Sequence, residues 1–175
     1  LLYNAADIIV VSRYAGSEAM ASVGATGSLS ALIVSLFIGL SAGAGVVVSR
    51  YHGARDAGGV HRAVHTSISL GIAAGLVASC VGIALSEYLL KLMGTPEGKV
   101  LDGAVLYMII YFVGVPAALI YNFGASVLRA LGDTRRPLYI LAFSGIVNVI
   151  LNLVFVIELN MSVAGVAIAT SVSNY

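Results

Sequence analysis

One acidic residue lies inside an otherwise uncharged run at the start of the chain. Asp7 falls within residues 1–12, which carry no other charge. In a lipid bilayer a central carboxylate costs about 2.5–3.5 kcal/mol, so intramembrane acids are rare and usually functional. Burial favours the neutral acid and a nearby cation favours the carboxylate. Asp7 therefore has the chemistry of a proton or sodium switch, unless it lies at a helix end in water.

Two amides recur one helical turn apart near the other end of the chain. Asn148 and Asn152 lie in GIVNVILNLVF, and a spacing of four places both on one face of a helix. Amide oxygens can coordinate a cation or accept hydrogen bonds from a ligand. Polar side chains also join helices to one another in membranes. The residue types alone leave both roles open.

Further polar residues lie in the neighbouring apolar runs. Asn122 lies deeper than the basic segment that follows it, and it is a candidate for lining a cavity. Tyr107 is expected at a membrane interface, where Tyr and Trp gather. Thr170 is a weaker signal, because hydroxyl residues are tolerated in apolar helices.

The composition identifies the solvent around these residues as lipid. The 175 residues are 59% hydrophobic and 10% charged, with a net charge of +1, and the mean hydropathy is +1.01. Soluble domains carry about 25% charged residues. A fold of this size cannot hide so much apolar surface from water. The near-neutral charge argues against nucleic acid as a partner.

Long uncharged runs predict an all-α, polytopic transmembrane bundle. Spanning a bilayer takes about 20 apolar residues, and backbone groups in lipid must pair within a helix. We expect six spans, at about residues 1–14, 26–50, 64–86, 102–126, 138–158 and 162–175. The first and last start or stop within an apolar run and are expected to be cut. The runs are too long and too uniformly apolar for a transmembrane β-barrel.

Basic residues in the links predict the orientation in the membrane. The link after the second span carries Arg50, Arg55 and Arg62 against one acid, and the link after the fourth is equally rich in arginine. Short basic loops stay in the cytoplasm. Links 2–3 and 4–5 are therefore expected to be cytoplasmic in a multi-pass protein of the cytoplasmic (inner) membrane.

Histidine and cysteine give no further site at this stage. The three histidines, His52, His61 and His65, lie in or beside the first basic link, and their spacing predicts no metal site there. The single cysteine, Cys80, lies in an apolar run and is expected to pack as a small hydrophobe. There is no Ser/His/Asp arrangement and no phosphate loop, so we expect no enzyme.

Three stretches together resemble one transporter family. GLSAGAGVVVSRYHGARD, LRALGDTRRPLYILAFSGIVNVILNLVFV and VAGVAIATSVS are similar, in order and spacing, to segments of the multidrug and toxic compound extrusion (MATE) transporters. The resemblance implies a twelve-helix protein of two six-helix bundles. Residues 1–175 would then form an incomplete N-terminal bundle, and the C-terminal bundle of the same chain would be its partner.

The resemblance also implies roles for particular residues. Asp7 matches the acid on the first helix of that bundle, and Tyr3 lies one turn before it, facing the same cavity. Asn122, Asn148 and Thr170 match cavity-lining positions. Asn152 stands where many prokaryotic members carry a second acid, which leaves Asp7 as the deep carboxylate and argues against a two-carboxylate relay. We assign cation coupling to Asp7, Asn148, Asn152 and Thr170, and the substrate cavity to Tyr3 and Asn122.

The implied activity is export driven by a cation gradient. Protons or sodium ions would enter as amphipathic or cationic drugs and toxic compounds leave, with no other cofactor and no metal beyond a sodium ion at Asp7. The main alternative is a flippase for lipid-linked oligosaccharides from the same superfamily. Such proteins line the cavity with arginine and lysine, and no basic residue lies deep in a span here. A non-transporting membrane module is the other alternative, but it would need no buried carboxylate.

Overall fold

The computed structural model describes residues 16–158 and 161–173, and the regular secondary structure in this part of the chain is all helical. The helices are α2 (Gly16–Gly53), α3 (Ala57–Leu92), α4 (Lys99–Ala130), α5 (Arg135–Leu153) and α6 (Ser162–Ser173). A π-helical turn, η1 (Val154–Glu158), continues α5. The all-α prediction is confirmed for these residues, whereas the first expected span lies outside them.

Four of the described helices are long and apolar enough to cross a membrane, and α6 is a shorter apolar helix. They match four of the expected spans, and the count of six remains a prediction. The helices are longer than the apolar runs: α2 begins at Gly16 rather than near residue 26, and α3 begins at Ala57 rather than near 64. The expected start near residue 64 follows Arg62, whereas the first ten residues of α2 are uncharged apart from Glu18. Charged residues are good helix formers, so helices continue past them into water.

Local signals explain where two of these helices begin. Before α3, the Oδ1 atom of Asp56 accepts a hydrogen bond from the Gly59 amide at 2.8 Å and so caps the helix. Before α5, Oδ1 of Asp133 accepts from the amides of Arg135 and Arg136, each at 3.1 Å. Both acids stand in the basic links and satisfy amides that have no partner within the first helical turn.

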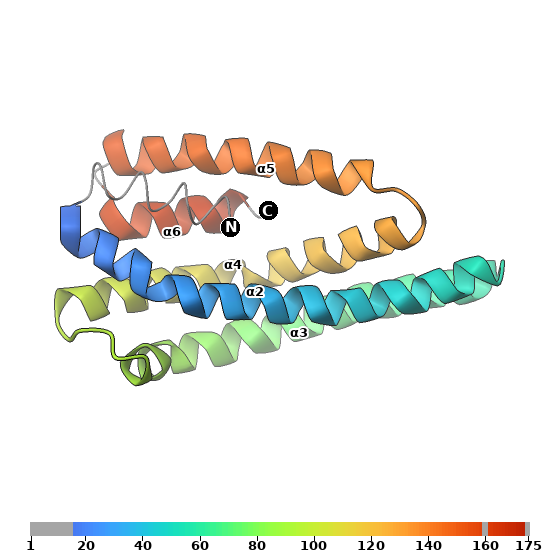
Figure 1. Ribbon diagram of the computed structural model, residues 1–175, viewed down its shortest axis with the longest axis horizontal. Helices are drawn as coiled ribbons and strands as arrows, with labels where there is room; N and C mark the ends of the chain where they lie inside the picture. The colour runs from blue at the N-terminus through green and yellow to red at the C-terminus, as the bar shows by residue number, and fades with distance from the viewer. Residues whose placement is uncertain (1–15, 159–160, 174–175) are drawn as a thin grey trace.

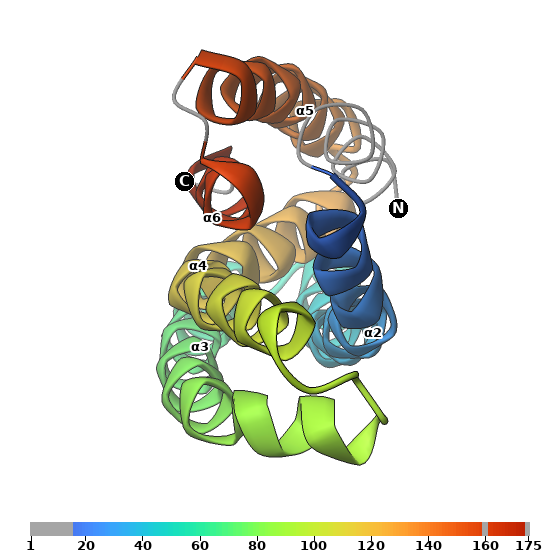
Figure 2. The same ribbon diagram turned by 90° about the vertical axis from the view of Figure 1, so that its left-hand side faces the viewer.

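The helices form a three-helix group with a two-helix group beside it. α4 packs against α2 and α3, while α5 packs mainly on α6 and η1 and contacts α4 sparsely. α6 lies between α5 and α4, which Figures 1 and 2 show from two directions. The sparse contact between α4 and α5 makes α6 the main connection between the two groups.

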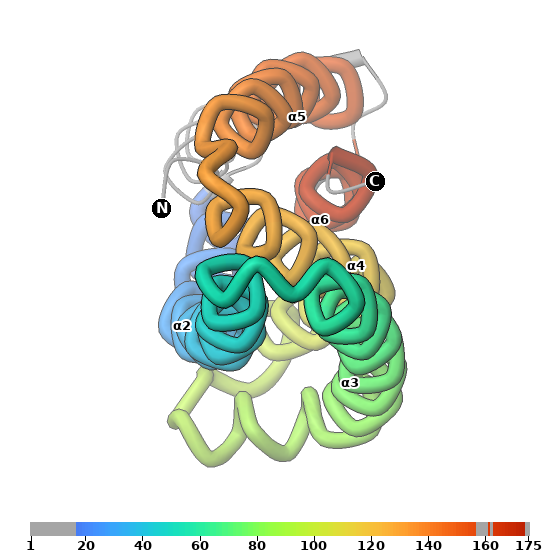
Figure 3. Tube along the Cα trace, turned by 90° about the vertical axis from the view of Figure 1, so that its right-hand side faces the viewer, coloured from blue at the N-terminus to red at the C-terminus, as the bar shows by residue number. Residues whose placement is uncertain are grey.

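The two basic links lie at the same end of the molecule. The α2–α3 and α4–α5 turns are together in Figures 1 and 3, and the α3–α4 link is at the opposite end. This is the arrangement that the charge-based topology requires. The α2–α3 hairpin projects beyond the α4–α5 turn (Figure 1). A 36-residue helix such as α3 is about 54 Å long, so it exceeds the roughly 30 Å hydrocarbon core of a bilayer.

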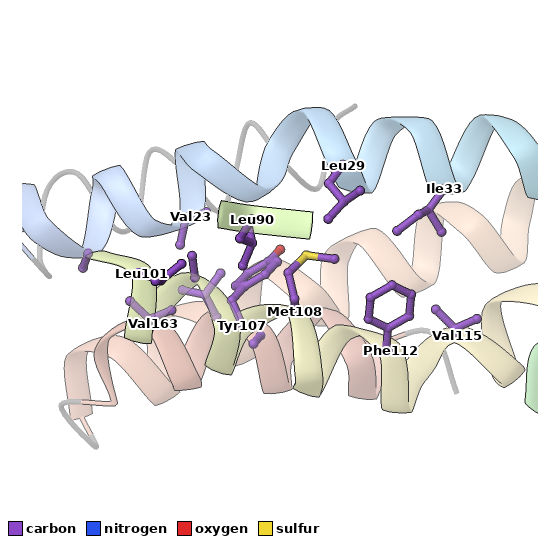
Figure 4. Packing of buried hydrophobic residues seen from close by; sticks show 14 of the residues in the cluster. Val23, Leu29, Ile33, Leu90, Leu101, Tyr107, Met108, Phe112, Val115 and Val163 are labelled. Carbon is purple, nitrogen blue, oxygen red and sulfur yellow. The ribbon is translucent and has the colours of Figure 1, made fainter. Parts of the chain in front are cut away.

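The core lies where α2, α3, α4 and α6 meet. Figure 4 shows Val23 and Ile33 of α2 facing Met108 and Phe112 of α4. Tyr107 is 2% exposed within this cluster. Its ring therefore packs among neighbouring helices, and its expected depth at the membrane interface stays a prediction.

The outward faces carry large apolar side chains. Leu36 is 64% exposed, Val77 63% and Phe143 71%. Apolar side chains spread this widely over four helices would be unstable in water and suit a lipid environment. The outer surface therefore agrees with the composition.

Two glycine pairs that looked alike in sequence differ in the structure. A Cβ added at Gly75 would lie 2.8 Å from the Cα of Pro116, and one at Gly71 would lie 3.1 Å from the Phe123 ring. These glycines let α3 approach α4 closely. Gly39 and Gly43 have nothing within 4 Å of an added Cβ in the described part of the chain. Among the described residues, Gly71 and Gly75 therefore lie against another helix, and Gly39 and Gly43 do not.

Candidate functional site

Three polar side chains meet inside the interface of α5 and α6. Asn148 and Asn152 are 0% exposed and Thr170 is 7% exposed. The Nδ2 atom of Asn152 donates to Oδ1 of Asn148 at 3.2 Å, and Nδ2 of Asn148 donates to Oγ1 of Thr170 at 3.4 Å. We call these three residues the amide cluster. The four-residue spacing predicted the shared face of the two amides, and the packing of α6 on α5 adds the hydroxyl.

The amide cluster continues a polar stripe along α5. Ser144 precedes Asn148 by one turn, and its Oγ donates to the backbone oxygen of Ser173 on α6. Ser173 in turn donates from Oγ to the backbone oxygen of Thr170 at 3.0 Å. Sequence reasoning missed both serines. Positions 144, 148 and 152 repeat every four residues, so the same periodicity that paired the amides would have found Ser144.

Apolar residues surround the amide cluster. Val166 and Ala169 of α6 are completely buried, and Ala167 is 1% exposed. In such surroundings a polar group depends on its partners in the protein, because water is not available to replace them. Interhelical hydrogen bonds in membranes contribute about 0.6 kcal/mol on average and up to about 1.7. The hydrogen bonds that join α5 to α6 would therefore contribute only a modest free energy to the stability of the bundle.

The amide cluster has the donor atoms that hard cations prefer. Hard cations bind carboxylate, carbonyl and hydroxyl oxygens. The Oδ1 atom of Asn148 already accepts from Asn152. An amide oxygen has two lone pairs, so this hydrogen bond uses only part of its capacity to accept.

Of the other predicted site residues, Asn122 lies in the described part of the chain, and its hydrogen bond there is not to the amide cluster. Asn122 is half-buried on α4, and its Nδ2 donates to the backbone oxygen of Ala118 on the same helix at 2.8 Å. Its bond is internal to α4, so the structure adds no cavity contact to the prediction. Asp7 and Tyr3 lie outside the described residues.

A mostly apolar groove of about 500 Å³ lies next to the polar stripe. Pro116 and Tyr121 line it from α4, Ser144 from α5 and Ser173 from α6. The Tyr121 hydroxyl donates to the backbone oxygen of Pro137 at 2.9 Å and bridges α4 to α5. The groove therefore reaches the two serines of the polar stripe, but no residue of the amide cluster lines it. In the described part of the chain, no group of three or more His, Cys, Asp or Glu side chains is placed to hold a metal ion.

Comparison with known proteins places this arrangement in a family. The MatE family profile matches residues 1–154. The probable multidrug resistance protein YpnP of Bacillus subtilis (strain 168) is 29% identical over 95% of this chain and 37% of its own length.

Two solved structures show the same fold at 29% identity over 99% of this chain. One is an inward-facing multidrug resistance MATE family transporter of the MOP superfamily, with a TM-score of 0.93 and 39% of that chain covered. The other is an outward-facing MATE family transporter, with a TM-score of 0.91 and 38% covered. The chain thus spans less than two fifths of the length of these relatives. Because the family profile covers most of the chain, the protein belongs to the MatE family of membrane transporters, as its motifs predicted, and it is not an enzyme.

Proposed function

We propose that this chain forms the N-terminal helical bundle of a twelve-helix exporter that uses a proton or sodium gradient to expel amphipathic or cationic small molecules. The observation that carries the proposal is the buried amide cluster of Asn148, Asn152 and Thr170 inside an apolar bundle. Membership of the MatE family and the fraction of each relative that the chain covers support it.

In this proposal the coupling cation binds Asp7 together with the amide cluster. Asp7 supplies the charge, and Asn148, Asn152 and Thr170 supply neutral oxygen atoms. Cation binding changes the charge and the hydrogen bonding of the cavity, and so it favours the arrangement of the bundle that presents these oxygen atoms. A ligand shifts a conformational equilibrium only by its difference in affinity for the two states. Tyr3 and Asn122 line the cavity that the exported molecule occupies.

Similarity to both an inward-facing and an outward-facing transporter supports a bundle that moves as a unit. Alternating access in transporters often proceeds by rocking one bundle against another about a central site. The cation would then act on the cavity inside this bundle, and the second bundle of the full-length protein would complete the substrate pathway.

The distribution of basic residues favours a cationic substrate over a lipid-linked sugar phosphate. All eight described arginine and lysine residues are exposed: Arg50, Arg55, Arg62, Lys91, Lys99, Arg129, Arg135 and Arg136. A cavity for phosphate would place cations where the phosphate binds. The two arginine-rich links share one end of the bundle (Figure 1), and we assign that end to the cytoplasm.

Export of a fluorescent cationic dye under an imposed gradient tests the proposed function. Cells carrying the full-length protein should expel the dye under either a proton or a sodium gradient, and the effective gradient identifies the ion. An ionophore that collapses that gradient should stop the export. Absence of export under both gradients would contradict the proposal and favour the lipid-linked flippase.

A substitution in the amide cluster tests the assignment of the cation site. Replacing Asn148 with Ala removes the central amide, which bonds both Asn152 and Thr170. Losing one oxygen ligand should raise the cation concentration that gives half-maximal export, by about tenfold for each 1.4 kcal/mol of binding free energy lost. Val149→Ala is the matched control, because Val149 is next in sequence but 41% exposed. An unchanged cation dependence in Asn148→Ala would argue that the cluster only joins helices.

A further inference from the structure

Two histidines that seemed unrelated in sequence form a pair on the surface of α3. The helix begins at Ala57, so His61 and His65 lie one turn apart on the same face. Their Nε2 atoms are 3.1 Å apart and their ring centroids 4.3 Å apart, with the rings tilted by 44°. The sequence placed His61 in a loop, and the earlier start of the helix brings the two rings together.

The separation of the two nitrogens fits two ligands on one metal ion. With metal–nitrogen bonds of about 2.0–2.1 Å, two imidazoles bound at an angle of 90–110° place their nitrogens roughly 2.9–3.4 Å apart. The observed 3.1 Å lies within this range. A hydrogen bond between neutral rings also brings the nitrogens together. To bind an ion through both Nε2 atoms, each ring must carry its proton on Nδ1.

The surroundings leave room for the rest of a coordination shell. Both rings are exposed, so water can occupy the positions that the protein does not fill. The neighbouring cation, Arg62, lies 4.0 Å from Asp56, which offsets its charge. The pair lies toward the α2–α3 hairpin, which projects beyond the α4–α5 turn (Figure 1). An ion could therefore reach it from the aqueous phase.

We propose that His61 and His65 form a binding site for a divalent first-row transition metal ion at the start of α3. Imidazole nitrogen suits Cu²⁺, Ni²⁺ and Zn²⁺, and affinity rises toward Cu²⁺. The bound ion links the second and third turns of α3 through their side chains. This site is separate from the amide cluster and does not depend on the proposed transport activity.

Copper binding by the untagged, full-length protein in detergent tests the site. Cu²⁺ added alone should give an electron paramagnetic resonance spectrum with coupling to two nitrogens. His61→Ala and His65→Ala should each weaken the binding by about 10²-fold, because a second tethered ligand raises affinity by roughly that factor. His52→Ala, in the last turn of α2, should bind like the wild type.

A rescue variant separates chelation from a general effect on α3. Adding Ala57→His to His65→Ala recreates a four-residue spacing with His61 on the exposed side of the first turn. This double variant should recover most of the lost affinity. Wild-type copper binding in both single alanine variants, an equal loss in His52→Ala, or no recovery in the double variant would each overturn the proposal.

Discussion

Replacing Asp7 with Asn is expected to abolish gradient-driven export while leaving the protein folded. The amide keeps the size and hydrogen-bonding shape of the side chain but cannot carry a negative charge. Removing one partner of a buried charge pair costs about 3–5 kcal/mol, which is well over a hundredfold in cation affinity. The cation would then no longer distinguish the two states of the bundle, and the gradient would drive no transport.

The measurement is dye export by cells producing equal amounts of wild type or variant in the membrane. Asp7→Glu is the conservative variant and should retain part of the activity, since it keeps the charge. Glu18→Gln is the matched control, because it makes the same acid-to-amide change at an exposed residue that lies 3.5 Å from Lys99. Full export by Asp7→Asn would show that the coupling cation binds elsewhere.

Replacing Gly75 with Ala is expected to destabilise the bundle, although alanine is the better helix former. The new methyl group would lie 2.8 Å from the Cα of Pro116, and a backbone atom cannot turn away as a side chain can. Overpacking of this kind costs about 1–3 kcal/mol. α3 and α4 would have to separate, which loosens the contact that also buries Gly71 against Phe123.

Replacing Gly39 with Ala is expected to stabilise the bundle instead. An added Cβ there meets nothing within 4 Å in the described residues, so the gain in helix propensity, up to about 1 kcal/mol, is not opposed. Thermal unfolding of both variants in one detergent gives the comparison. A midpoint for Gly75→Ala equal to or above that of Gly39→Ala would contradict the close approach of α3 to α4.

Much of this protein follows from the sequence alone. Lipid offers no hydrogen-bond partner to backbone groups, so a long uncharged run must pair them within itself. It therefore forms a helix regardless of the segments that pack beside it. The fold class and four of the spans could therefore be predicted, whereas the family was predicted from the resemblance of three stretches to its members. The shared face of Asn148 and Asn152 also followed, because helical geometry fixes which residues stand above one another.

The tertiary structure decided how these local elements meet. Thr170 completes the amide cluster only because α6 packs on α5. An added Cβ at Gly75 would lie 2.8 Å from Pro116 of α4, whereas one at Gly39 would meet no described atom within 4 Å. His61 and His65 form a pair because α3, capped by Asp56, begins before the apolar run and includes both residues. Spacing along a chain determines which residues share a helix face, and packing between helices determines what that face touches.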